Sequence, residues 1–381
     1  MTPADSATAI VVNAGSSSLK VTVLGSGDAV DAAFHLDHWD GSPDHAGLMD
    51  FLSRAGRDAM VAGHRVVHGG SRFSEAVLID ETVTAAIRDL TDLAPLHQPR
   101  ALAGITAAAR ALPGAPGVAC FDTAFHAGMP QAAACYALPG AWVQRFGLRR
   151  FGFHGLSHGY AARRAAQLLG ADLSGLRIVS CHLGAGASLA AVQAGRSVDT
   201  TMGFTPLEGL VMATRSGTVD PGLIVWLLQR GRLDLDEVAA GLEQSAGLAG
   251  LSGVPAGDVR DVQRAAADGD SAAQLAIDVY LHRLRREIAA MAAAMNGLDA
   301  LAFTGGIGEH NPAIRAAAAA GLEFLGVRID PGRNEATADA DISHPDAAVP
   351  ALVITAREDV EIARQARQVL ARRGREGCGG R

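Results

Sequence analysis

The chain has almost no lysine. Among its 33 basic residues Lys20 is the single lysine, and all the others are arginine. Lysine carries a compact point charge that suits phosphate binding, so a lysine kept in the turn-like stretch NAGSSSLK is a candidate phosphate contact. The alternative is that a lone lysine fell there by chance.

The chain also lacks the features of several protein classes. With 40 acidic residues and a net charge of −7, no basic surplus exists for general nucleic-acid binding. No apolar run approaches the roughly 18 residues of a membrane helix. The N-terminal MTPADSATAI does not read as a signal peptide. The four cysteines show no CxxC spacing, so a reduced cytoplasmic setting is expected.

Two similar hairpin-like segments are present. Residues 8–24 read as a strand, a Gly/Ser turn and a strand, and residues 177–192 repeat this pattern with HLGAGAS as the turn. Glycine in such a loop lets the backbone approach a phosphate closely. A chain of 381 residues favours two domains, and the repeat predicts that they are duplicated α/β domains.

Further elements alternate between these hairpins and after them. The patterns predict strands at 61–67, 118–121, 301–304 and 351–355, and helices at 97–114, 157–170, 271–296 and 357–373. In LAFTGGIGEHNPAIR a glycine loop is expected after the strand, and then a helix with Asn311 as its N-cap and Pro312 at its first position. The GREGCGGR tail is expected to be disordered.

Eight motifs, in order along the chain, resemble the acetate kinase family, which shares a superfamily with sugar kinases, actin and a heat-shock ATPase. They are NAGSSSLK (13–20), HRVVHGG (64–70), FDTAFH (121–126), FGFHGLSH (151–158), HLGAGAS (182–188), GFTPLEGLVMATRSG (203–217), GDVR (257–260) and FTGGIGEH (303–310).

The resemblance implies a fold, a cofactor and an assembly. The fold is two duplicated ribonuclease-H-like, actin-like ATPase domains with the active site in the cleft between them. The expected domains are 1–155 plus 365–381, and 156–364. The resemblance further implies ATP/ADP as co-substrate, Mg²⁺ (or Mn²⁺) as cofactor, and a homodimer that acts on small molecules and binds neither nucleic acid nor membrane.

The resemblance also implies roles for residues. Catalytic residues are Asp122, His154 and Arg215; the acid is bound by Arg65, with Val67, Leu96, Phe153 and Pro206 as apolar pocket walls. The metal is positioned by Asn13 and Glu358. The nucleotide contacts are Ser16, Ser18, Lys20, His182, Leu183, Gly184, Ala185, Gly186, Asp258, Val259, Arg260, Gly305, Gly306, Ile307, Gly308 and Glu309.

These residue types suit transfer of a phosphoryl group to a carboxylate. Phosphoryl transfer needs alignment and neutralisation of charge more than covalent chemistry. A carboxylate is already ionised at pH 7, so Asp122 is expected to orient groups or hold Mg²⁺ through water rather than to act as a base. Arg65 and Arg215 offer donor forks to anions, and His154 can donate to a phosphoryl oxygen.

Four departures from the family pattern affect details. Ala185 stands where asparagine is usual, Gln98 gives HQP in place of HNP, and Thr218 stands where an aspartate is common. The last motif reads TARED, which makes Glu358 the metal candidate and leaves its neighbour Asp359 as the alternative.

Three other functions are compared with an acetate kinase. A propionate or butyrate kinase of the same family would differ only in its pocket, because one methylene is worth only about 1–3 kcal/mol. A sugar kinase would need polar groups where apolar ones are expected. A nucleotide-dependent binding or filament module would have no use for Arg65, His154 and Arg215 together.

Overall fold

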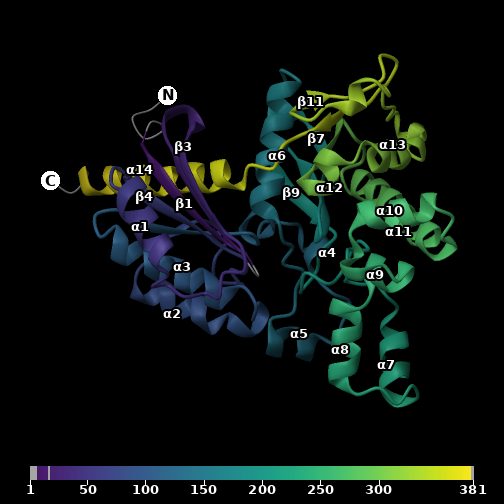
Figure 1. Cartoon of the computed structure of the whole chain (residues 1–381), viewed down its shortest axis with the longest axis horizontal. Coiled ribbons are helices and arrows are strands. Elements are labelled where there is room, and N and C mark those ends of the chain that lie inside the picture. The colour runs from purple at the N-terminus through teal and green to yellow at the C-terminus, as the bar shows by residue number, and fades with distance from the viewer. Residues whose placement is uncertain (1–6, 16–17, 379–381) are drawn as a thin grey trace. The chain divides into compact units, whose positions relative to one another are not determined.

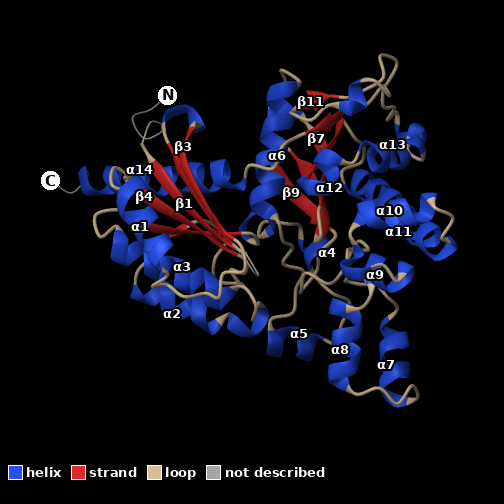
Figure 2. Ribbon diagram, in the orientation of Figure 1, coloured by secondary structure: helices blue, strands red, loops and turns tan. Residues whose placement is uncertain are grey.

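The structure is a computed structural model of the chain and describes residues 7–15 and 18–378. Strands and helices alternate along the chain (Figure 2) and form two compact units. The first unit comprises residues 1–127, 153–160 and 357–381, and the second comprises 128–152 and 161–356. The expected boundaries at 155 and 364 therefore differ from the observed ones. The segment 128–152 lies in the second unit, and the start of the last helix lies in the first.

The first unit is built on a six-stranded mixed sheet. Its strands are, in spatial order, β3 (Val30–Leu36), β2 (Leu19–Leu24), β1 (Ala9–Ala14), β4 (Val61–Val66), β6 (Gly117–Phe121) and β5 (Val77–Leu78). The hairpin predicted at 8–24 is present as the antiparallel pair β1–β2, with Asn13 opposite Lys20. β1, β4 and β6 run parallel, so their carboxyl ends lie at one edge of the sheet.

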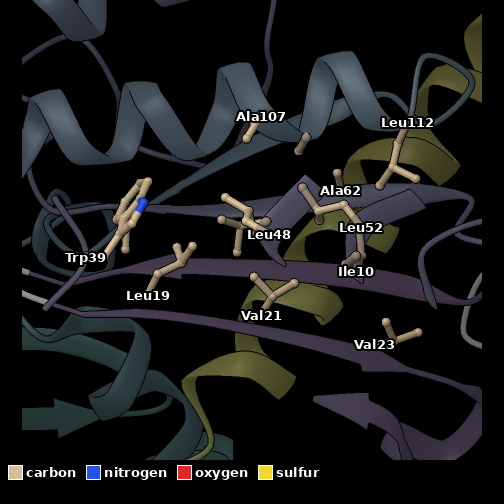
Figure 3. Packing of buried hydrophobic residues seen from close by; sticks show 13 residues of the cluster. Ile10, Leu19, Val21, Val23, Trp39, Leu48, Leu52, Ala62, Ala107 and Leu112 are labelled. Carbon is tan, nitrogen blue, oxygen red and sulfur yellow. The ribbon is translucent and has the colours of Figure 1, made fainter. Parts of the chain in front are cut away.

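Apolar side chains cover both faces of this sheet. On one face Ile10 and Val21 pack with Leu48 and Leu52 of α1 (Ala46–Ala55) and with α3 (Gln98–Ala111), as Figure 3 shows. On the other face Val61 and Val118 pack against one side of α14 (Glu358–Cys378), formed by Ile362, Ala363 and Ala366. This apolar stripe explains why the beginning of α14 belongs to the first unit.

The second unit repeats the sheet order of the first. Its strands are, in spatial order, β9 (Arg196–Thr200), β8 (Ala187–Gln193), β7 (Arg177–Leu183), β10 (Ala300–Thr304), β12 (Ala351–Val353) and β11 (Ala340–Asp341). The antiparallel pair β7–β8 corresponds to β1–β2, and the parallel strands β7, β10 and β12 correspond to β1, β4 and β6. At the edge, β11 pairs antiparallel with β12, as β5 does with β6. The predicted duplication is confirmed at the level of topology.

The remaining helices are shown in Figure 1. They are α2 (Glu81–Asp89), α4 (Gln131–Ala134), α5 (Gly140–Phe146), α6 (Gly155–Leu168), α7 (Pro221–Gln229), α8 (Leu235–Gln244), α9 (Gly247–Ser252), α10 (Val259–Ala267), α11 (Ser271–Ala294), α12 (Gly305–His310) and α13 (Pro312–Ala320). In the described part of the chain, no helix combines the length and apolar character needed to cross a membrane.

Two local predictions are wrong. Residues 305–310 form the short helix α12 instead of a loop, because Gly305, at φ +77°, makes the turn out of β10 and the helix starts at once. The tail was expected to be disordered from Gly374, but α14 continues to Cys378. The predicted N-cap is confirmed: Asn311 accepts from the Ile314 backbone N–H at 3.0 Å, with Pro312 following it.

Candidate functional site

A partly buried polar cluster lies at the edge of the first sheet where β1, β4 and β6 end. Arg65 of β4 donates from Nε and Nη2 to Asp122 Oδ2 at 3.0 and 2.6 Å. Its Nη1 donates to Asn13 Oδ1 at 3.3 Å and lies 3.8 Å from Glu358 Oε2. Asn13 Nδ2 donates in turn to Glu358 Oε2 at 3.0 Å. Four predicted site residues are thus in direct contact.

Burial sets the electrostatics of this cluster. Asp122 is 1% exposed, and burial raises its pKa to about 6; the adjacent Arg65 opposes the rise, and the charge of Glu358 adds to it. Burial acts to lower the pKa of Arg65, but the two carboxylates outweigh it and the pKa is raised. Arg65 is therefore a permanent cation between two acids. Asp122 Oδ1 is buried and has no hydrogen-bond partner in the described structure.

The oxygens of this cluster fit a hard divalent cation. Mg²⁺ is bound in proteins by one or two carboxylates, with waters and substrate phosphates as its other ligands. Among the described residues no three His, Cys, Asp or Glu side chains cluster as a metal site on their own. Between the two acids at the start of α14, Asp359 is held by Arg357 at 2.9 and 3.0 Å, whereas Glu358 reaches Asn13.

His154 has a backbone conformation that is unusual for its residue type. Its φ is +55°, in the left-handed region that costs a non-glycine residue free energy. The backbone on both sides of it is anchored: His126 Nε2 donates to the Phe153 carbonyl at 3.0 Å, and the Gly155 N–H donates to the Asp122 carbonyl at 3.0 Å. Backbone strain that surrounding contacts hold in place is common at functional sites.

The predicted apolar pocket residues of the first unit differ in how far they are exposed. Val67 and Phe153 are buried, at 7% and 1% exposure, and Phe153 packs edge-on against His68 with ring centroids 5.4 Å apart. Leu96 is 66% exposed, so in this unit it does not form a closed wall with them.

Lys20 is exposed on β2 directly across from Asn13. Opposite residues of an antiparallel pair point to the same side of the sheet, so Lys20 shares the side of the polar cluster. Between β1 and β2 the Gly15 N–H donates to the Ser18 carbonyl at 2.8 Å. Ser16, a predicted nucleotide contact, lies outside the described residues.

In the second unit Arg215 and Pro206 are in contact. Arg215 Nη1 donates to the Pro206 carbonyl at 3.4 Å and lies 3.9 Å from Met212 Sδ. Burial lowers the pKa of Arg215, against the opposing charge of Glu243, and no ion pair holds it within the described chain. A guanidinium with such weak contacts can bind an anion.

A cavity of about 450 Å³ brings three predicted nucleotide segments of the second unit together. It is lined by Gly184 and Ala185 after β7, by Gly306 and Ile307 after the parallel strand β10, and by 258–260 at the start of α10. Ligands commonly bind at the carboxyl ends of parallel strands. The other predicted contacts in this unit, His182, Leu183, Gly186, Gly305, Gly308 and Glu309, do not line the cavity.

Two of these residues instead shape the surroundings of the cavity. A side chain at Gly305 would meet the Leu183 carbonyl oxygen at 2.8 Å, and Glu309 Oε1 accepts from the Ala356 N–H at 2.9 Å. Sequence reasoning missed Ala213, Leu248, Ala256, Gly257, Tyr280, His310 and Asn311, which also line the cavity. Gly257 and His310 lie inside quoted motifs, whereas Tyr280 sits in a long helix whose sequence gives no signal.

The departures have local consequences. Ala185 lines the cavity without a side-chain donor, and its carbonyl accepts from the Ala213 N–H at 3.1 Å. Gln98 is fully buried, and its Nε2 donates to the His68 carbonyl at 2.9 Å. Thr218 Oγ1 accepts from the Gly209 N–H at 3.0 Å.

Two units of the same sheet order, one with a partly buried Asn–Arg–Asp–Glu cluster and one with a glycine-lined cavity, define a duplicated α/β protein with the actin-like ATPase fold. Residues 48–364 match the Acetokinase family. An acetate kinase of Acetivibrio thermocellus is 50% identical over 304 residues, which are 80% of this chain and 76% of that protein. The chain belongs to the acetokinase family.

Solved structures of the family superpose on nearly the whole chain. An acetate kinase of Porphyromonas gingivalis, 35% identical, has a TM-score of 0.88 and covers 96% of this chain and all of its own. A propionate kinase of Francisella tularensis, 34% identical, has a TM-score of 0.86 and covers 95% of this chain and all of its own.

Proposed function

We propose that this chain transfers the γ-phosphoryl group of ATP reversibly to acetate, giving acetyl phosphate and ADP. The observation that carries the proposal is Arg65, a half-buried cation fixed between Asp122, Asn13 and Glu358. A permanent donor fork beside oxygen ligands suits a reaction that joins a carboxylate to a metal-bound phosphate. Family membership supports the same reaction.

The first unit supplies the groups for the acid. Arg65 binds the carboxylate, and the buried Val67 and Phe153 offer apolar surface to its methyl group, with Leu96 at the exposed side. Asp122 holds Arg65 in place. Because acetate is ionised at neutral pH, no residue has to remove a proton from it.

The second unit supplies the nucleotide cavity and the donor Arg215. Gly184, Ala185, Gly306 and Ile307 present backbone to the nucleotide, and the Pro206 carbonyl orients Arg215. Arg215 and His154 donate to the phosphoryl oxygens, where charge develops during transfer. Lys20 contacts the nucleotide phosphates.

Asn13, Glu358 and Asp122 would hold Mg²⁺, or Mn²⁺ in its place. The ion, when bound, neutralises phosphate charge. Glu358 is preferred to Asp359 as the ligand, because Arg357 already occupies the Asp359 carboxylate. The free Oδ1 of Asp122 offers a site for a water of the metal.

A propionate kinase is the second candidate. The solved structures of an acetate kinase and a propionate kinase resemble this chain almost equally, at 35% and 34% identity. Leu96, at 66% exposure, does not close off the pocket that we propose at Val67 and Phe153, so a longer acid is the alternative substrate.

The test is a hydroxamate assay with Mg·ATP and formate, acetate, propionate or butyrate. We expect acetate to give the highest kcat/KM, propionate the next and butyrate a much lower value. A higher kcat/KM for propionate than for acetate would favour the second candidate. Acyl phosphate formation from none of the four acids would refute both.

We further propose that the protein is a cytoplasmic homodimer that contacts its partner through α7. Leu223, Val225, Trp226 and Leu228 are 45%, 50%, 56% and 39% exposed, and none of the side chains of α7 is buried. An apolar helix left uncovered marks an interface. Light scattering should give a dimer for wild type and a monomer for Trp226→Glu, while Phe324→Glu, at a residue 75% exposed elsewhere, stays dimeric.

A further inference from the structure

The second unit contains another cavity, which we name the Arg283 cavity, with a volume of about 360 Å³. Its walls come from the 209–219 segment, the start of α9 and one side of α11. They carry apolar and polar side chains, namely Val211, Val219, Leu251, Val279, Ser216, Thr218, Ser245 and Arg283. The volume is within the range of small-molecule sites.

Arg283 gives this cavity an uncompensated positive charge. It is half-buried and, among the described residues, makes neither a hydrogen bond nor an ion pair. Its neighbours on α11 differ: Arg286 pairs with Glu287, and Arg285 donates to the Ala317 carbonyl. None of the residues that line the cavity is acidic. An anion in the cavity would supply the missing partner.

The other walls define the chemistry of that anion. Thr218 Oγ1 already accepts from Gly209, so its O–H remains able to donate to an anion. One guanidinium and a few hydroxyls balance one negative charge, whereas a phosphate dianion beside Val211, Val219, Leu251 and Val279 would be poorly compensated. The walls therefore suit a single carboxylate on a compact apolar body.

The cavity shares its backbone with the loop that carries Arg215. The Ala246 N–H donates to the Thr214 carbonyl at 3.1 Å, and the Leu248 N–H to the Met212 carbonyl at 2.9 Å. A side chain at Gly247, which lines the cavity, would lie 2.7 Å from the Arg215 carbonyl oxygen. Backbone hydrogen bonds and the close approach at Gly247 therefore connect the wall at 245–250 to this loop.

We propose that the Arg283 cavity binds a small organic carboxylate through the Arg283 guanidinium and that its occupancy stabilises the 209–217 loop. The binding does not depend on the proposed reaction; only its effect on catalysis, through Arg215, rests on that function. The site is a second carboxylate site, separate from Arg65, and would let an organic acid regulate the enzyme.

The binding test is isothermal titration of the full chain with 4-methylpentanoate and, as a neutral match, 4-methylpentanamide. We expect the acid to bind, and we expect the Kd of the amide to be at least about ten-fold higher, because the amide cannot form the charge-assisted hydrogen bond. Arg283→Gln should weaken binding of the acid by a similar factor. Arg286→Gln, an exposed arginine of the same helix outside the cavity, should leave its Kd within about two-fold.

Amide hydrogen exchange of the 209–219 segment tests the coupling without any enzyme assay. The acid should slow exchange there in wild type and in Arg286→Gln, but not in Arg283→Gln. Thr218→Asp, which places a carboxylate on the cavity wall, should abolish both binding and protection. The proposed site is wrong if wild type does not bind the acid at millimolar concentration or binds the amide as tightly as the acid. It is also wrong if the two arginine variants lose the same affinity for the acid. Unchanged exchange on binding would overturn the coupling.

Discussion

Replacing Arg65 by alanine would leave the Asp122 carboxylate buried without its cation. Asp122 is 1% exposed and loses two hydrogen bonds, of 3.0 and 2.6 Å, in this variant. Removing one partner of a buried pair costs about 3–5 kcal/mol of unfolding free energy, because the other charge stays uncompensated. We expect this loss at pH 8. It should shrink towards pH 5, since the pKa of Asp122 is already raised to about 6 and a protonated Asp122 no longer needs Arg65.

Urea unfolding followed by the fluorescence of Trp39 measures this loss in the first unit. Trp39 is 2% exposed, whereas Trp142 and Trp226 are both 56% exposed and can be replaced by phenylalanine. Adding Asp122→Asn to Arg65→Ala should restore most of the stability, because the unpaired charge is gone. The control is Arg110→Ala, which breaks an exposed pair with Asp44 and should cost less than about 1 kcal/mol.

The reasoning fails if Arg65→Ala is no less stable than Arg110→Ala at pH 8, or if Asp122→Asn does not rescue it. Kinetic measurements on the same variants distinguish the catalytic role of Arg65 from its role in stability. We expect kcat/KM for acetate to fall by about 10²–10⁵ in Arg65→Ala and to stay low after the rescue. The Kd for ATP should change little, because Arg65 does not line the nucleotide cavity.

Three further outcomes are expected. Burial lowers the pKa of His126 to about 4, although its hydrogen bond to the Phe153 carbonyl acts in the other direction. The neutral His126 therefore contributes fully to the free energy of unfolding above pH 6.5, and this contribution is lost towards pH 4 by up to about 1.4 kcal/mol per pH unit. The urea-unfolding free energy of His126→Gln should depend less on pH than that of wild type, and an equal pH dependence would contradict this. Ala185→Asn should tighten ATP binding by up to about 1 kcal/mol, and a ten-fold weaker Kd would show that the loop requires alanine. Lys20→Arg should melt normally but lose about ten-fold in kcat/KM, because a planar fork fits the turn poorly; unchanged kinetics would make the lone lysine an accident.

The elements that the sequence predicted best have a strong local pattern. Residues 8–24 and 177–192 were predicted as apolar strands joined by glycine-bearing turns, and both form antiparallel pairs. The segment 305–310 was misjudged because glycine is a poor helix former, yet the segment forms α12 with Gly305 and Gly308 buried.

The site was predicted through motif resemblance, and its contacts were not. Asn13 and Glu358 are 345 positions apart, so no local pattern indicates that they bond. The choice between Glu358 and Asp359 depends on Arg357, which holds one of two adjacent acids. Arg283 was missed for a similar reason: an arginine on a long helix looks ordinary until its lack of a partner is seen in three dimensions.

The position of α14 has a consequence for the order in which the protein can mature on the ribosome. β1 and β4 are synthesised before the second unit, but the face that carries Ala9, Val11 and Val61 is covered by Ile362 and Ala366, which are synthesised after it. The second unit is nearly continuous and can complete its core while the chain is still being extended. The first unit is thus completed only after the second, and until α14 has been synthesised its uncovered apolar strands expose surface that a chaperone can bind.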